Sequence, residues 1–425
     1  MTTLDTRTTM AADEAAAVIS TFRRHLSSGR ASLGEMFGGH LEDRSHGALV
    51  YTRGGVEYLN CAGYGVFILG ATHPYVTDAV IAQVRTHPVS TRILLEPLAA
   101  AAAEALINVC PPGLTKVHFV GSGTEATETA LKMARAHGKR RLITTVNGYH
   151  GKTMGALSVT ARSIYQDTFR PLLPDVEQIP YGDAAALEQV LKDGPESCFI
   201  LEPVQGEGGV IIPPAGYLTE VQRLCRAYGC FLIADEILTG IGRLGRWWGV
   251  NAEGIEPDVM LVGKGLSGGV IPVAAAVATE KAYKPFDKDP FLHTSTFAGA
   301  PVAMAAAKAA IEAVIAEDAV NKASTTGHLL KEGITSSAQR HRPHLIREIR
   351  GEGLLIGVEA HDAGLAGELV LELLDARVLV NHSLNNSAVL RLTPPALLTT
   401  DEADRLLSAV DLAFAALARR FPSAR

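Results

Sequence analysis

The feature that most constrains the fold of this sequence is an alternation of short apolar segments and helical segments in the middle of the chain. The apolar segments are Lys116–Val120, Arg141–Val146, Cys198–Leu201, Cys230–Ala234 and Val259–Val262. Helical patterns lie between them, at Glu125–His137, Ala184–Lys192 and Tyr217–Tyr228. Strands that alternate with helices form βαβ units, so we expect an α/β fold with a mainly parallel sheet covered on both faces.

The sequence predicts three units along the chain. Residues 1–60 form an N-terminal segment, a helical lead-in followed by a strand pair, which we expect to pack with the small domain. Residues 61–310 form the large domain, and an Ala-rich helix at Ala300–Ala316 leads out of it. Residues 311–425 alternate helices and strands and predict a smaller α+β C-terminal domain.

Charge and cysteine usage exclude several classes of protein. The 39 basic and 45 acidic side chains give a net charge of −6, without the basic excess that is typical of a nucleic-acid binder. The five cysteines show no CxxC pair or metal-ligand spacing, so we expect reduced thiols and no metal site. No basic and apolar leader opens the chain, and no run of about 18 apolar residues suggests a membrane span. We therefore expect a cytoplasmic protein.

The 41 glycines gather in clusters, and the first cluster predicts an anion site. Gly121-Ser122-Gly123-Thr124 follows an expected strand and opens an expected helix. Free N–H groups and the helix dipole attract anions there, and Ser122 and Thr124 add hydroxyl donors. An ordinary tight turn with a helix cap is the alternative interpretation of the same residues.

Two further polar residues also follow expected strands. Asp235 ends the apolar run at Cys230–Ala234, where its carboxylate can pair with a cationic ring nitrogen. Lys264 lies among glycines after Val259–Val262, and a desolvated lysine can form a Schiff base. Taken singly, they also fit a helix cap and a surface lysine. Together with the anion loop, they match the ring nitrogen, aldehyde and phosphate of pyridoxal 5'-phosphate (PLP).

At this point the sequence resembles the class III (ω-type) aminotransferases, PLP enzymes of fold type I. Asp235–Arg243 resembles the family's DE[VI]xTGxGR segment, and Pro257–Gly269 its PD…xKxLxGG segment. The likeness covers about residues 50–415 and is strongest to the putrescine-specific members. It implies a seven-stranded, mainly parallel sheet in the large domain, and a homodimer with shared active sites.

The resemblance also assigns roles to individual residues. Lys264, Asp235 and Tyr149 would be catalytic, with the Tyr149 ring stacked on the cofactor and Ile237 on its other face. Thr296 would reach the phosphate bound by the partner subunit. The cofactor-binding set that it implies is Ser122, Gly123, Thr124, Tyr149, His150, Glu202, Asp235, Ile237, Lys264 and Thr296.

For the substrate, the resemblance points to a carboxylate-binding arginine. Arg391 would bind glutamate or 2-oxoglutarate, and Glu207 would pair with Arg391 when no carboxylate is bound. Tyr64 would line the pocket. The chain departs from the family at Leu238, where a glutamine usually donates to the ring hydroxyl of the cofactor.

The resulting hypothesis is ping-pong transfer of a terminal amino group, from a diamine such as putrescine or an ω-amino acid, to 2-oxoglutarate. Two alternatives keep the cofactor: a biosynthetic transaminase of a larger tailored substrate, and a racemase or epimerase. A third is a non-catalytic binding protein on a decayed enzyme fold. The intact Lys264, Asp235 and Arg391 argue against the third.

Overall fold

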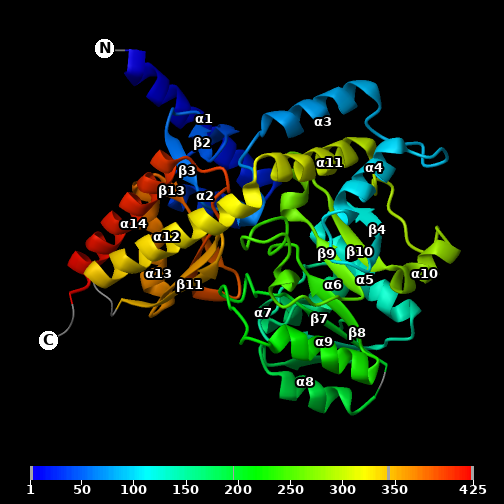
Figure 1. Cartoon of the computed structure of the whole chain (residues 1–425). Coiled ribbons are helices and arrows are strands. Elements are labelled where there is room, and N and C mark those ends of the chain that lie inside the picture. The colour runs from blue at the N-terminus through cyan, green and yellow to red at the C-terminus, as the bar shows by residue number, and fades with distance from the viewer. Residues whose placement is uncertain (1–2, 195, 342–344, 423–425) are drawn as a thin grey trace.

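A computed structural model describes residues 3–194, 196–341 and 345–422 of the chain (Figure 1). Its central element is a seven-stranded sheet with the order β4-β10-β9-β8-β7-β5-β6. Within this sheet β10 runs antiparallel to both neighbours, and the other paired strands are parallel. The expected mainly parallel, seven-stranded sheet is therefore confirmed. Its strands are β4 (Leu114–Val120), β5 (Arg141–Thr145), β6 (Val176–Ile179), β7 (Ser197–Leu201), β8 (Phe231–Asp235), β9 (Val259–Val262) and β10 (Ala274–Thr279).

Side chains of the central strands alternate between two apolar cores, one on each face of the sheet. In β8, Phe231 and Ile233 belong to one core, and Leu232 and Ala234 belong to the other. A sheet covered on both faces requires such fully apolar strands. The first face is covered by α5 (Gly123–Ala136) and α10 (Glu280–Lys288). The second core contains residues of α3 (Pro74–Thr86), α4 (Pro97–Ile107), α8 (Ala184–Leu191), α9 (Tyr217–Tyr228) and α11 (Pro301–Ala316).

Two strands of the large sheet were not predicted from the sequence. β6 has four residues at the sheet edge and includes a glutamate and a glutamine, so it lacks an apolar run. β10 has the sequence AAAVAT, and alanine favours helices when it is considered without its context. Pairing on both sides with β4 and β9 overrides that preference.

The C-terminal region has a four-stranded antiparallel sheet with the order β11-β12-β15-β14. Its strands are β11 (Ile346–Glu352), β12 (Leu355–Ala360), β14 (Asn381–Ser383) and β15 (Asn386–Leu392). Its helices are α12 (Ala319–His341), α13 (Ala363–Asp375) and α14 (Thr400–Arg420), and Figure 1 shows them grouped on one side of the molecule. This is the expected smaller C-terminal domain. α11 is continuous to Ala316, so the predicted boundary at residue 310 falls inside a helix and stays a prediction.

The N-terminal strands pair with a strand from the C-terminal region. After α1 (Thr3–His25) and α2 (Ser28–Met36), a sheet forms in the order β1-β2-β3-β13. β3 is parallel to β13, with Leu59 opposite Val378 and Asn60 opposite Leu379. The bounds in this sheet are β1 (Glu42–His46), β2 (Leu49–Thr52), β3 (Glu57–Asn60) and β13 (Val378–Leu379).

The parallel strands all place their carboxyl ends at one edge of the large sheet, where the predicted site residues follow them. The remaining short helices are α6 (Met154–Val159), α7 (Ser163–Gln166), and 3-10 turns at Gly63–Gly65, Asp167–Phe169, Gly249–Ala252 and Lys264–Ser267. All five cysteines are free thiols. In the described part of the chain, no helix combines the length and the apolar character needed to cross a bilayer.

Candidate active site

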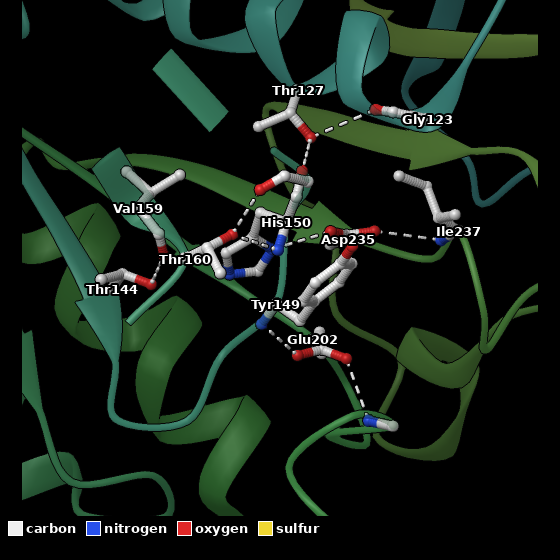
Figure 2. Close-up of polar contacts among 12 residues, drawn as sticks. Gly123, Thr127, Thr144, Tyr149, His150, Val159, Thr160, Glu202, Asp235 and Ile237 are labelled. Carbon is white, nitrogen blue, oxygen red and sulfur yellow. Dashed lines mark hydrogen bonds and ion pairs between the residues drawn. The ribbon is translucent and has the colours of Figure 1, made fainter. Parts of the chain in front are cut away.

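The carboxylate of Asp235, the last residue of β8, is held by two hydrogen bonds (Figure 2). Nδ1 of His150 lies 2.7 Å from its Oδ2, and the backbone N–H of Ile237 donates to its Oδ1 at 3.1 Å. The Asp235 side chain is 4% exposed and that of His150 is 0% exposed. A carboxylate has about four lone-pair positions, so Asp235 can still accept a hydrogen bond from a cationic N–H group.

The backbone of His150 is fixed on both sides by threonine hydroxyls (Figure 2). Its N–H donates to Oγ1 of Thr160 at 2.9 Å, and its carbonyl accepts from Oγ1 of Thr127 at 2.8 Å. Thr127 belongs to α5, so this contact ties the loop after β5 to the helix that begins at the expected anion site. The resemblance predicted a cofactor-binding role for His150 without a specific contact, and the structure makes it the partner of Asp235.

The neighbouring Tyr149 is positioned by a buried carboxylate. Its N–H donates to Oε1 of Glu202 at 3.0 Å, and the N–H of Gly206 donates to Oε2 of Glu202 at 2.9 Å. Burial raises the pKa of Glu202 to about 7. Burial, with the charge of Glu207, also raises the pKa of Tyr149 to about 12, so its phenol stays protonated at neutral pH. The contacts of Glu202 therefore fix two loops, and they leave the half-buried Tyr149 ring able to stack on a ligand.

The expected anion loop joins β4 to α5. Ser122 caps the helix: its Oγ accepts from the N–H of Glu125 at 3.4 Å and donates to that residue's Oε2 at 3.0 Å. Oγ1 of Thr124 lies 2.9 Å from Oγ1 of Thr153. A Cβ on Gly123 would lie 2.8 Å from the Ile237 side chain, so only glycine allows the helix start to approach the segment after Asp235. The loop thus combines a helix N-terminus with a close backbone approach.

Lys264 follows β9 and begins a 3-10 turn with φ of 41°. Its ammonium makes no hydrogen bond or ion pair with any residue that the structure describes. Burial, and next the charge of Arg391, lower the pKa of Lys264 to about 8. A lysine with a lowered pKa is neutral more often, which makes it a better nucleophile toward a carbonyl carbon.

These residues fit PLP. The Lys264 amine has no partner among the described residues, Asp235 can accept from a ring N–H, and the start of α5 offers backbone donors to a phosphate. The charge of Asp235 affects the pKa of Lys264, so these two groups are neighbours. The side chain of Ile237 connects them to the anion loop, because a Cβ on Gly123 or on Gly263 would lie 2.8 or 3.3 Å from it. The structure therefore brings together the three attachments that the sequence analysis placed at separate strand ends.

Arg391, in β15, forms a buried ion pair with Glu207. Nη2 of Arg391 lies 2.7 Å from Oε1 of Glu207, and the two side chains are 0% and 4% exposed. The contact is not aligned as a hydrogen bond, and none of the three guanidinium nitrogens has a hydrogen-bond partner in the described chain. A buried guanidinium without hydrogen bonds is costly, so a ligand carboxylate that forms two of them would be strongly attracted.

Tyr64 and Thr296 lie at the surface of the single chain. Tyr64 has φ of 52°, and its N–H donates to Oδ1 of Asn381 at 3.2 Å. It is near enough to Tyr149 to affect the pKa of that phenol. Thr296 is exposed between α10 and α11, and the described residues include no side-chain hydrogen bond from it to the site. A role at the site requires Thr296 to act in another subunit.

Leu238 stands where the family usually has a glutamine, and in this structure its side chain serves to pack the site. The side chain is buried and packs in a small apolar cluster with Val204, Val210, Leu244 and Leu355. A Cβ on Gly206 would lie 2.0 Å from Cδ2 of Leu238, and one on Gly65 would lie 2.4 Å from its Cδ1. Leu238 therefore fills the space between two loops of the site. The sequence showed the substitution but not these contacts.

Two buried residues close to Asp235 in the sequence, Glu236 and Trp248, have structural roles. Both oxygens of the buried Glu236 accept hydrogen bonds, from Thr239 and from the N–H groups of Gly249 and Val250. Trp248 is fully buried, and its Nε1 donates to the carbonyl of Val109 at 2.6 Å. Trp248 therefore packs in the interior of the protein.

Comparison with known proteins agrees with this geometry. Residues 36–414 match the family described as Aminotransferase class-III. An ornithine aminotransferase from Toxoplasma gondii, whose structure has partial occupancy of PLP, superposes with a TM-score of 0.85 at 31% identity, covering 90% of this chain and 92% of that one. The omega transaminase from Pseudomonas jessenii, solved with PMP, gives 0.85 at 29% identity, covering 92% and 95%. A transaminase from the marine bacterium Virgibacillus gives 0.84 at 25% identity, covering 90% and 94%. The chain therefore belongs to the class III aminotransferases, which are PLP-dependent enzymes.

Proposed function

We propose that this enzyme transfers the amino group of a terminal primary amine to 2-oxoglutarate in a ping-pong cycle. The observation that carries the proposal is the buried pair of Arg391 and Glu207 beside Lys264. The guanidinium forms no hydrogen bond within the part of the chain that the structure describes, and its charge affects the pKa of Lys264. A dicarboxylic keto acid can therefore place one carboxylate on Arg391 while its carbonyl end faces the lysine.

The residues of the chain divide the chemistry between them. PLP, when bound, supplies an aldehyde for amine capture and a ring that accepts electrons. Asp235, oriented by His150, holds the proton on the ring nitrogen. Lys264 moves the proton on the carbon next to the amine, a task that its pKa of about 8 suits near neutral pH.

Glu207 allows one pocket to serve two different substrates. When it pairs with Arg391, the positive charge is neutralised and an amine without a carboxylate at that position can enter. When a dicarboxylate arrives, its carboxylate takes the place of Glu207 on the guanidinium. This exchange supports transamination over racemisation, because a racemase needs no second substrate.

The amine donor is a diamine such as putrescine or an ω-amino acid, and one observation favours the ω-amino acid. Nζ of Lys152 lies 3.9 Å from the Tyr165 ring centroid and 5.9 Å from that of Tyr149. Lys152 has no carboxylate partner in the described chain. A positive charge there repels the second ammonium of a diamine and attracts the carboxylate of an ω-amino acid.

We propose that the working enzyme is a homodimer with shared sites. Large apolar side chains are exposed in the α3–α4 connection, at Ile93, Leu94 and Leu95, and in the α10–α11 connection, at Phe291 and Phe297. Figure 1 shows both connections on the same side of the large domain, and Arg92 donates to the carbonyl of Ser295 between them. An exposed apolar surface of this kind is typical of an interface. It would carry Thr296 to the site of the partner.

The free thiols support the further proposal that the enzyme acts in the cytoplasm, where thiols stay reduced.

An amine-donor screen tests the proposed reaction. The holoenzyme is mixed with 2-oxoglutarate and, in turn, putrescine, 4-aminobutanoate and β-alanine, and the glutamate formed is measured. We expect glutamate with at least one donor, and a KM for 2-oxoglutarate that rises at least about 10²-fold in Arg391→Met, which lacks the guanidinium. Pyruvate, which has no second carboxylate, serves as the matched acceptor whose KM should change much less. No glutamate with any donor, or equal effects of Arg391→Met on both acceptors, would contradict the proposal.

A further inference from the structure

Glu207 lies on a closed turn formed by residues 205–211. Gln205 and Ile211 pair through two backbone hydrogen bonds, of 3.0 and 2.9 Å, at the base of the turn. Val210 has φ of 55°, a left-handed conformation that is unfavourable for a β-branched residue. Such a conformation persists only when contacts from outside the turn hold it in place.

Arg350, in β11 of the small domain, supplies those contacts. Its Nε donates to the carbonyls of Gly209 and Val210 at 2.9 and 3.0 Å, and its Nη2 donates to that of Gly209 at 2.6 Å. The same guanidinium is held from behind by two carboxylates: Nη1 contacts Glu348 at 2.7 Å and also pairs with Glu359. The arginine therefore has a fixed orientation, with one edge on the turn and the other on its own sheet.

The side chain of Val210 is fitted into the same sheet. It is fully buried, and a Cβ on Gly357 of β12 would lie 2.9 Å from the Cβ of Val210. Glycine at 357 thus makes room for the strained residue. The turn belongs to the large domain by sequence, but its Gly209 and Val210 contact strands of the small domain.

The other side of the turn is held by backbone groups between β14 and β15. The N–H of Leu384 donates to Oε2 of Glu207, and the N–H of Asn385 donates to the carbonyl of Glu207, both at 2.9 Å. Together with Arg391, all of these groups come from the small domain. The position of Glu207 opposite Arg391 therefore depends on the contacts that the turn makes with β11 and β12.

We propose that Arg350 is a positioning residue for Glu207, which it keeps within reach of Arg391 by holding the Gly209–Val210 segment of the turn. This inference rests on the proposed function, in which Glu207 competes with a substrate carboxylate for Arg391. Arg350 does not touch the substrate or the cofactor. It stabilises the closed pairing of Glu207 with Arg391, and so it opposes dicarboxylate binding and assists the half-reaction of the amine donor.

The direction of the effect separates this role from a purely structural one. Loss of the clamp loosens the turn and weakens the competitor, so a dicarboxylate should bind more tightly to Arg350→Met than to the unaltered enzyme. The amine half-reaction should slow, because Arg391 is less often neutralised. General damage to the site would weaken both.

A double-mutant cycle with glutarate, an unreactive dicarboxylate, tests the proposal. The Kd of glutarate is measured on the holoenzyme by calorimetry for Arg350→Met, Glu207→Ala and the double variant. We expect Arg350→Met to lower the Kd about fivefold and Glu207→Ala to lower it about tenfold or more. In the Glu207→Ala background, Arg350→Met should add no further change, because the residue acts through Glu207.

Two further variants keep the result interpretable. Arg347→Met is the matched control, because Arg347 lies in the same strand and pairs with the same Glu359 but does not contact the turn; its glutarate Kd should be unchanged. Arg350→Lys retains a donor and should give an intermediate Kd, even if Arg350→Met folds poorly. If Glu207→Ala leaves the Kd unchanged, the exchange in the proposed function is wrong. If Glu207→Ala lowers the Kd but both Arg350 variants leave it unchanged or weaken binding, only the role of Arg350 is wrong.

Discussion

Nη2 of Arg391 lies 2.7 Å from Oε1 of Glu207, yet no N–H of the guanidinium is aligned to donate a hydrogen bond to any described residue. The charges of Arg391 and Glu207 therefore neutralise each other, but this contact provides no hydrogen bond for the N–H groups of the guanidinium. Breaking one partner of a buried pair leaves an uncompensated charge, at a cost of about 3–5 kcal/mol.

The substitution Glu207→Gln should reveal this energetic cost as a loss of thermal stability. We expect the melting temperature of the holoenzyme to fall, because Arg391 becomes an unpaired buried cation. Glutarate should restore stability and raise the melting temperature of the variant more than that of the unaltered enzyme, since a ligand that binds the folded state stabilises it. Thermal unfolding with and without glutarate measures both effects. Equal shifts in the two proteins would argue against the pairing.

Asp235→Asn should remove the charge opposite the ring nitrogen while keeping the shape of the side chain. Because the neutral amide no longer stabilises a protonated ring, we expect kcat to fall about 10²-fold or more. The Asn oxygen still accepts from the N–H of Ile237, so the melting temperature should change little. Steady-state glutamate formation, with the melting curve as the control for folding, checks this. A kcat within about threefold of the original would exclude the role.

The pKa of Lys264 predicts how PLP loading depends on pH. The neutral amine attacks the aldehyde, and with a pKa of about 8 roughly a tenth of the lysines are neutral at pH 7. Reconstitution of the apoenzyme should therefore accelerate as pH rises toward 8 and level off above it. Stopped-flow absorbance at several pH values measures the rate, and Lys264→Ala should show no such phase. A rate still rising steeply above about pH 10 would indicate an ordinary exposed lysine.

The raised pKa of Glu202 predicts that the stability of the folded protein falls as pH rises. Its usual value is 4.5 and burial raises it to about 7, so the folded apoprotein binds more protons than the unfolded chain between these values. This residue should therefore make stability fall as pH rises through that window. Glu202→Gln lacks the titrating group and should show a flatter dependence, measured by urea unfolding at about pH 5 and about pH 7.5. Parallel curves for the two proteins would contradict the assignment.

Gly206→Ala tests the packing of Leu238. The new methyl group would lie 2.0 Å from Cδ2 of Leu238, so we expect a loss of about 1–3 kcal/mol in the free energy of unfolding. Leu238→Ala removes the obstructing atoms, and combining the two changes should cost less than the sum of the single changes. Urea unfolding of the three variants gives the interaction energy. If the losses in unfolding free energy of the two single variants simply add up in the double variant, the contact between residue 206 and Leu238 does not determine the packing here.

Local sequence patterns predict that the candidate site lies at the carboxyl ends of the parallel strands. Apolar runs mark β8 and β9, and the polar residues that follow them, Asp235 and Lys264, come to one edge because parallel strands share a direction. The fold class followed from the same alternation. These predictions needed only the period of the pattern and the residue at the end of each strand.

Contacts between distant segments could not be predicted in this way. His150 and Asp235 are 85 positions apart, and neither residue type indicates the other as its partner. In the sequence, nothing distinguishes Arg350 from the other charged residues of its strand. Its contact with the turn that carries Glu207 depends on the register between β11 and β12. A short strand such as β6 likewise depends on its neighbour β5 rather than on its own composition.

The pairing of β3 with β13 has a consequence for how the protein is made. Residues 59–60 emerge from the ribosome more than three hundred residues before their partners at 378–379. The carbonyl of Cys61 likewise accepts a hydrogen bond from the N–H of Thr393, which is made later still. The N-terminal strands must remain unpaired on that side throughout synthesis of the large domain. Such delayed long-range contacts slow folding, and they leave a strand edge exposed on the nascent chain until the segment that carries Arg391 has been translated.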